Sequence, residues 1–228
     1  MKKLIFTAAF VLIEFAFLTA QTLDEIIDYH FDAVNQDKFN QTKTIIIESD
    51  FNSPDGNGKI LIFHKRPNKL RIEQTINQRT LLTLFDGVNC FVISSVDTNN
   101  LIGKDLEEIK SAADLDGYFF CYREKARDLK YIGEFSEGGK KFYQINCTEI
   151  SGDTTNIFID SKSYLIAKTI QHKNGTIKET GMENYKKIED ISFPHKLTTA
   201  ENGKTKTQIV KKIKLNEELP EELFTLKK

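Results

Sequence analysis

The stretch of residues 58–91 constrains the fold of this chain most strongly. It holds three short runs rich in Ile, Leu and Phe, and turn-forming residues separate them. Pro67 ends the first run, because proline lacks an amide donor and restricts the residue before it. A polar pair divides the second run from the third, and Asp86-Gly87 is typical of a tight hairpin turn. The stretch therefore predicts consecutive antiparallel strands, with Arg66 at the end of one of them.

The rest of the chain continues the strand pattern on both sides of this stretch. Residues 44–47 are Thr and Ile, which suit a pleated sheet. From residue 129 onward, alternating segments recur between turns rich in Gly and Asn, and the total is about eleven strands in an up-and-down meander without parallel crossovers. Because the twist of so many strands accumulates, we expect an open, curled sheet that encloses a cavity.

Helices are predicted only at the start and in the middle of the chain. Residues 22–36 begin with a capping box of Thr22 and Glu25 and continue with an apolar stripe at helical spacing. Residues 104–115 predict a second helix, and residues 117–126 a short third one. Because these two segments interrupt a β-protein, we expect them to cover a face or an opening of the sheet.

The N-terminus has the features of a secretory signal peptide. Met1-Lys2-Lys3 precedes an apolar run over residues 4–17, and Ala20 is a small residue suited to cleavage. An uncleaved membrane anchor is the alternative, but the run is shorter than the roughly 20 residues of a spanning helix. We therefore expect an exported, periplasmic protein that is cleaved after Ala20, with a single domain over residues 21–228.

Composition and motifs give little support to catalysis or nucleic-acid binding. The chain has 32 basic and 33 acidic residues, without the basic excess typical of nucleic-acid binders. It contains no nucleophile elbow, P-loop or zinc-protease motif. The histidines lie in different predicted elements and suggest no metal site: His30, His64, His172 and His195. We expect a protein that is not an enzyme and has no cofactor.

The cysteines leave two interpretations open. They are Cys90, Cys121 and Cys147, each in an apolar stretch. An exported chain could oxidise two of them to a disulfide. Alternatively, all three are free thiols that act as small apolar side chains.

The strand region of residues 58–91 resembles the LolA/LolB-like family of periplasmic lipoprotein carriers. The resemblance rests on a basic-Arg-Pro-Asn turn at residues 65–68, on Leu70, on Asp86-Gly87 and on Phe91. Family members usually have an aromatic residue in place of Leu70 and Trp in place of Phe91. Later segments resemble outer-membrane lipoprotein-sorting proteins in the same order: residues 158–168, Tyr185 with residues 191–194, and residues 215–224.

The resemblance implies a fold, a function and a set of partners. The implied fold is α+β, an open half-barrel of antiparallel strands covered by an N-terminal helix and a mid-chain helical lid. The implied function is a non-catalytic periplasmic carrier that shelters lipoprotein acyl chains for sorting to the outer membrane. The partners would be an acylated lipoprotein or other lipid, an inner-membrane loading complex and an outer-membrane acceptor, with a monomeric carrier and no nucleic acid. The alternatives are an envelope sensor or regulatory module of the same fold, which binds lipoproteins or other amphiphiles, and a general lipid binder.

The same resemblance implies four ligand-binding residues. In the family, the arginine that matches Arg66 hydrogen-bonds to the lid helices and holds the empty carrier closed. A guanidinium suits this role because its planar fork can bind several carbonyls at once. The alternative is an exposed arginine at a strand end. Leu70, Ile72 and Phe91 match apolar family positions, and we expect them to line the ligand cavity.

Overall fold

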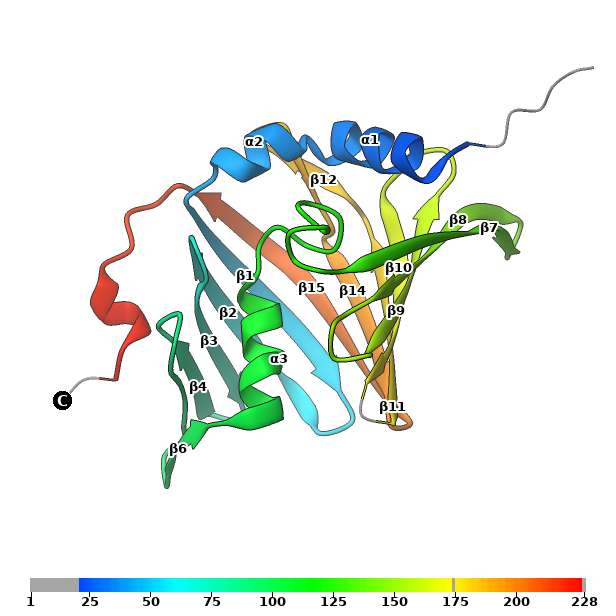
Figure 1. The fold of residues 1–228 in the computed structure, drawn as a ribbon. Coiled ribbons are helices and arrows are strands. Elements are labelled where there is room, and N and C mark those ends of the chain that lie inside the picture. The colour runs from blue at the N-terminus through cyan, green and yellow to red at the C-terminus, as the bar shows by residue number, and fades with distance from the viewer. Residues whose placement is uncertain (1–20, 174, 227–228) are drawn as a thin grey trace, which may run out of the picture.

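A computed structural model describes residues 21–173 and 175–226 of the chain (Figure 1). The signal-peptide prediction concerns residues 1–20, which lie outside this range. The described chain forms a large antiparallel sheet, a two-stranded sheet, three α-helices and a short 3-10 helix. None of the helices in the described ranges is long and apolar enough to cross a membrane.

The large sheet has thirteen strands in the order β6-β5-β4-β3-β2-β1-β15-β14-β11-β10-β9-β8-β7. The strands of its first half are β1 (Thr44–Ser53), β2 (Gly56–Lys65), β3 (Lys69–Ile76), β4 (Arg79–Phe85), β5 (Cys90–Ile93) and β6 (Thr98–Leu101). Those of its second half are β7 (Asp128–Glu137), β8 (Lys140–Thr148), β9 (Thr154–Asp160), β10 (Ile166–Lys173), β11 (Thr176–Glu183), β14 (Lys196–Glu201) and β15 (Lys204–Leu215). The strands β12 (Lys186–Ile188) and β13 (Ile191–Phe193) form the small sheet.

The chain path confirms antiparallel pairing but corrects the prediction of one continuous meander of about eleven strands. The first and last strands, β1 and β15, pair in the middle of the large sheet. From β1 the chain runs outward to the edge strand β6, crosses to the opposite edge at β7, and returns inward to β15 (Figure 1). The sheet is open and not strongly curled, so the twist of its strands does not bring the two edges together. Turn signals reveal neighbouring strands, but they carry no information about this pairing of the chain ends.

The first helix, α1 (Leu23–Val34), begins at the predicted capping box. The Thr22 hydroxyl accepts a hydrogen bond from the Glu25 amide at 3.3 Å, and the Glu25 carboxylate accepts one from the Thr22 amide at 2.8 Å. The helix ends at Asn35, whose φ of 60° is left-handed, and α2 (Gln36–Gln41) follows directly. The predicted helix over residues 22–36 therefore ends at Val34, and α2 is an additional helix that lies almost wholly beyond the predicted range.

The crossing between the two sheet edges contains α3 (Gly103–Ala113), close to its predicted range of 104–115. The predicted helix over residues 117–126 is wrong, because this segment forms a series of turns. Gly117, Cys121 and Ala126 have φ values of 70°, 52° and 51°. Such left-handed residues interrupt right-handed helical geometry. We call residues 114–127 the cover segment.

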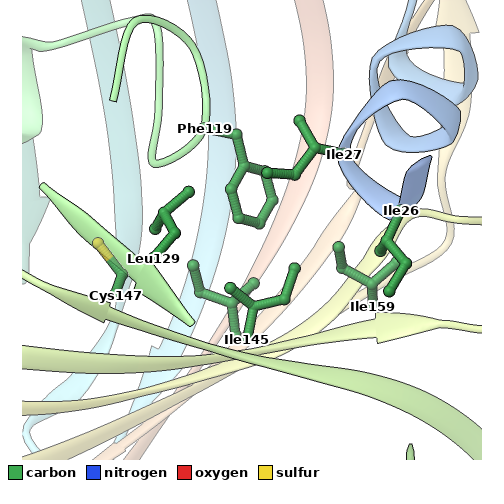
Figure 2. Close-up of a cluster of buried hydrophobic side chains, with 8 residues drawn as sticks. Ile26, Ile27, Phe119, Leu129, Ile145, Cys147 and Ile159 are labelled. Carbon is green, nitrogen blue, oxygen red and sulfur yellow. The ribbon is translucent and has the colours of Figure 1, made fainter. Parts of the chain in front are cut away.

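Three apolar clusters join these elements to one face of the sheet. Figure 2 shows the first, in which α1 and Phe119 of the cover segment pack on β7, β8 and β9. The second joins β1, β13 and β15, with Phe39 of α2 packed against it. The third joins β3, β4 and β5 to Ala113 of α3. We call this covered side of the sheet the inner face.

The opposite, outer face of the first sheet half is covered by the C-terminal segment with the 3-10 helix η1 (Glu221–Phe224). The side chain of Phe224 is almost fully buried. Arg71 donates a hydrogen bond of 2.9 Å to the carbonyl of Leu223, and Lys65 donates one of 2.7 Å to the carbonyl of Leu219. Because neighbouring residues of a strand point to opposite faces, Arg71 on the outer face places Leu70 and Ile72 on the inner face.

Candidate functional site

A cavity of about 460 Å³ lies between the inner face of the sheet and its helical cover. Its wall comes from α1, α2, residues 112–119 and strands β1, β2, β10, β11 and β13. Most of the lining is apolar and includes Phe39, Ile47, Leu115, Met182 and Phe193. The volume falls within the range of about 300–1,000 Å³ that is typical of ligand pockets. The cavity therefore suits an apolar ligand or the apolar part of a larger one.

Arg66 follows the last residue of β2 and joins this strand to two parts of the cover. Its Nε donates a hydrogen bond of 2.9 Å to the Thr42 carbonyl, and its Nη2 donates a longer one of 3.4 Å to the Phe39 carbonyl. Both carbonyls lie at the end of α2, where the last helix carbonyls lack their regular intrahelical partners; that of Phe39 also accepts a hydrogen bond of 3.0 Å from the Thr42 amide. Its Nη1 lies 2.5 Å from Oδ1 of Asp116 in the cover segment. Contacts to the cover are those that the resemblance implies for Arg66, whereas the ion pair with Asp116 is a feature that the structure adds.

The ion pair with Arg66 changes the acidity of Asp116. Desolvation raises the pKa of this carboxyl group, but the hydrogen bond from Arg66 and the charges of Arg66 and Lys125 outweigh that effect. The net pKa lies below the usual value of an aspartate, so the carboxylate is ionised at neutral pH. The contact between Arg66 and Asp116 is thus a charge-assisted hydrogen bond, which is stronger than a neutral one.

Further ion pairs hold the cover segment in its turned shape. Lys125 lies 2.8 Å from a carboxylate oxygen of Asp114 and 3.4 Å from one of Asp116. Arg127 lies 3.4 Å from Asp114. Asp114 and Asp116 also line the cavity, so the same carboxylates belong to the cavity wall and to the contacts that fix it.

The structure separates the three apolar residues that the sequence analysis grouped together. Leu70 and Ile72 lie on the inner face beneath α3, where Leu70 is almost fully buried against Phe85 and Cys90. They do not line the 460 Å³ cavity. Phe91 follows Cys90 in β5 and therefore points to the outer face. Phe91 thus cannot share a cavity with Leu70, and a ligand role for Leu70 and Ile72 remains a prediction that requires α3 to move.

His64 is a cavity residue that the sequence analysis did not select. It lines the cavity from β2, and its Nδ1 atom is buried without a hydrogen-bond partner among the described residues. Desolvation lowers its pKa to about 4, so the ring is neutral at pH 7. A signal for this position was present in the sequence, because His64 continues the alternation of Ile60 and Ile62 toward the apolar face of the strand.

His30 of α1 also lines the cavity, but it differs from His64 in having a partner. Its Nδ1 lies 2.7 Å from the Tyr164 carbonyl oxygen, and a protonated Nδ1 donates a hydrogen bond to it. Burial lowers the pKa of His30 against the opposing effect of this hydrogen bond. His30 is therefore a buried histidine whose Nδ1 has a hydrogen-bond partner.

Potential metal ligands, cysteines and a second cavity also occur in the described part of the chain. Within residues 21–173 and 175–226, no three His, Cys, Asp or Glu side chains are grouped so that they could hold a metal ion. Cys90 and Cys147 are buried and Cys121 is exposed, and all three are free thiols.

A larger cavity of about 830 Å³ lies between α3 and the turn after β8. Charged side chains such as Lys104 and Arg127 line it, which makes it unsuited to an apolar ligand.

Comparison with known proteins agrees with the architecture described above. No protein-family model and no curated protein sequence matches the chain. Solved structures do match: a LolA-superfamily protein from Nitrosomonas europaea has 14% identity and a TM-score of 0.64, and the match covers 91% of this chain and 99% of that one. A DUF1329-family protein from Desulfovibrio piger matches with 12% identity and a TM-score of 0.62, over 88% of this chain and 97% of that one.

A third matching structure has a name that refers to lipoprotein sorting. It is a domain named for outer-membrane lipoprotein sorting, from Vibrio parahaemolyticus, with 10% identity and a TM-score of 0.60 over 87% of this chain and 97% of that one. At sequence identities this low, the structural matches are evidence for a shared fold and not for a shared activity. The resemblance found in the sequence is thereby confirmed at the level of architecture: this chain has the fold of the LolA superfamily and of outer-membrane lipoprotein-sorting domains.

Proposed function

We propose that this protein is a non-catalytic carrier that shelters acyl chains in the cavity between the sheet and its cover. The single observation that carries the proposal is the apolar cavity of about 460 Å³ beneath a cover that Arg66 holds through its bonds to Thr42 and Asp116. The fold shared with lipoprotein-sorting domains supports a ligand of this class. In this proposal residues 21–228 act as one carrier domain in the periplasm.

The physical problem for such a carrier is release rather than binding. Burial of one methylene group contributes about 0.8 kcal/mol, so a sixteen-carbon chain contributes on the order of 12 kcal/mol before ordering costs. A carrier with that affinity would not give up its ligand. A closed, empty state of comparable stability lowers the net affinity, because the ligand must displace the cover before it binds.

Arg66 supplies part of the stability of the closed state. Its bonds to the end of α2 and to Asp116 hold two parts of the cavity wall together. An acyl chain that moves the cover segment away from the sheet must break the contact with Asp116. Re-formation of this contact after the acyl chain leaves would favour transfer of the chain to an acceptor. If the ligand has more than one acyl chain, α3 must move as well, which would expose Leu70 and Ile72.

Lipid extracted with the protein from the periplasm and identified by mass spectrometry tests this proposal. We expect acylated peptides or other acyl lipids in a fixed ratio to the protein. The Ile47→Trp variant, prepared in the same way, serves as the control. Ile47 lines the cavity from β1, and the larger ring should fill part of the cavity volume. If the wild type and this variant hold the same lipids in the same amount, the lipid does not occupy the cavity.

A separate experiment, transfer of the bound lipid to acceptor vesicles, distinguishes a carrier from a sensor. A carrier transfers its bound lipid to acceptor vesicles, whereas a sensor or regulatory module retains it and binds a further protein. We propose an inner-membrane donor complex and an outer-membrane acceptor as the partners, and monomeric protein as the transferring species.

A further inference from the structure

His64 interrupts a row of apolar side chains that crosses the inner face of the sheet. The pairing register aligns six residues across six strands: Cys90, Phe85, Leu70, His64, Ile45 and Leu215. The other five side chains are buried and apolar, with exposed fractions between 0% and 8%. A leucine or isoleucine at position 64 would complete the row. The polar ring is thus an exception in an otherwise apolar row.

The exception weakens the folded protein in the absence of a ligand. Nδ1 of His64 is one of two buried side-chain polar atoms without a hydrogen-bond partner among the described residues, and the other belongs to Gln21. A buried polar atom without a partner destabilises a fold, because it loses its hydrogen bond to water and gains none in return. Such a group in a native structure calls for an explanation, and a ligand that supplies the missing partner is one.

Packing alone does not account for His64. Its strand neighbours in the register are Leu70 and Ile45, neither of which can accept or donate a hydrogen bond through its side chain. A metal role is also unsupported, since no cluster of metal-binding side chains occurs within the described residues. The ring lines the cavity, so a molecule in the cavity can reach it.

We propose that His64 binds an uncharged hydrogen-bonding group of the ligand, such as the hydroxyl, ester or amide that adjoins an acyl chain. This inference rests on the carrier function proposed above and names the chemistry of its ligand. Neutral imidazole has one donor nitrogen and one acceptor nitrogen, so Nδ1 suits a group that can donate or accept. An amphiphile would place its chain among the apolar residues of the cavity and its polar linkage at His64.

The cavity disfavours an ionised head group at this position. The cavity-lining residues that the structure describes include no Lys or Arg. The acidic groups of the lining, Asp114 and Asp116, are already paired with Lys125 and Arg66. The His64 ring is neutral at pH 7 and offers no charge to a carboxylate. A fatty acid anion would therefore be desolvated here without an ionic partner, which is costly.

Competition binding with three probes of equal chain length tests the inference. The probes are 1-monolauroylglycerol, dodecane and dodecanoate, each displacing a fluorescent apolar reporter from the purified full-length protein at pH 7. The variants are His64→Leu, which removes the ring nitrogens, and His64→Gln, which keeps hydrogen-bonding capacity. His172→Leu is the matched control, because His172 is exposed on β10 away from the cavity.

We expect 1-monolauroylglycerol to bind the wild type roughly two- to ten-fold more tightly than it binds His64→Leu, the range that one hydrogen bond supplies. Dodecane should bind His64→Leu at least as tightly as the wild type, and His64→Gln should retain part of the preference. In the wild type, the ¹⁵N resonance of Nδ1 should shift with 1-monolauroylglycerol and remain unchanged with dodecane. His172→Leu should behave as the wild type does.

Two negative results have different meanings. If all three probes bind but the ratio of the monolauroylglycerol and dodecane affinities is the same in the wild type and in His64→Leu, the role of His64 is wrong and the carrier function stands. The role is equally wrong if dodecanoate binds the wild type more tightly than 1-monolauroylglycerol does. If no probe displaces the reporter from the wild type, the carrier function fails and the inference fails with it.

Discussion

Removal of the Arg66 guanidinium should weaken the closed state of the cover and raise the affinity for acyl ligands. In Arg66→Leu, three contacts are lost: the bonds to Thr42 and Phe39 at the end of α2 and the ion pair with Asp116. Only the ion pair connects Arg66 to the cover segment. We therefore take its free energy as the part that an entering ligand must overcome.

The magnitude follows from the geometry of that ion pair. A hydrogen bond to a charged group contributes about 1.5–3 kcal/mol to stability. Both side chains are 22% exposed, so water competes and the lower part of the range applies, about 1.5–2 kcal/mol. Because apparent affinity scales with the fraction of molecules in the binding-competent state, acyl ligands should bind Arg66→Leu roughly ten- to thirty-fold more tightly.

The assay is equilibrium binding of a fluorescent fatty-acyl probe, followed by the rate of probe transfer to empty phospholipid vesicles. We expect tighter binding and slower transfer for Arg66→Leu. Arg66→Lys should lie between this variant and the wild type, because an ammonium keeps the charge but lacks the planar fork. Arg79→Leu is the matched control, since Arg79 is exposed at the start of β4. Unchanged affinity and unchanged transfer in Arg66→Leu would show that Arg66 is an ordinary surface residue.

Three further predictions address the same site. Phe91→Ala should lower the free energy of unfolding by about 2 kcal/mol, because a partly buried ring is lost. It should leave the probe affinity unchanged, and a weaker affinity would place Phe91 in the binding surface. His64→Leu should raise the free energy of unfolding at pH 7, because it removes an unpartnered buried nitrogen, and a lower urea midpoint would contradict this. The folded-state pKa of His64 is about 4, below the value of about 6.5 in an unfolded chain. The free energy of unfolding of the wild type should therefore fall by up to about 3 kcal/mol relative to that of His64→Leu as the pH falls from 6.5 to 4. A difference between the two proteins that stays constant across this pH range in urea unfolding would refute the assignment.

The sequence revealed those parts of the fold that depend on neighbours in the chain. The capping box of Thr22 and Glu25 is formed as predicted, because both its partners lie within one helical turn. The antiparallel pairing around residues 58–91 is also correct, since its turns join strands that follow one another. The pairing of β1 with β15 links the two ends of the described chain, and no local pattern encodes it.

The candidate site shows the same division between local and distant information. The position of Arg66 at a strand end follows from the turn at Pro67, but its partner Asp116 is 50 residues away and lies in a segment without a clear periodic pattern. The resemblance predicts a shared cavity for Phe91 and Leu70, whereas the alternation of β5 places Phe91 on the outer face beside Leu84 of β4. The alternation of side chains along β2 and β5 carries the signal that places His64 on the inner face and Phe91 on the outer one.

Photolabelling reports where an acyl chain lies on the protein, and so it tests whether the chain occupies the cavity. A fatty-acyl probe with a diazirine in its chain is bound to the full-length protein and activated by light, and the labelled peptides are identified by mass spectrometry. We expect labels on cavity residues such as Ile47, Leu115 and Phe193, and a marked loss of them in Ile47→Trp. Labels confined to the outer face around Leu84 and Phe91, unchanged in Ile47→Trp, would contradict this expectation.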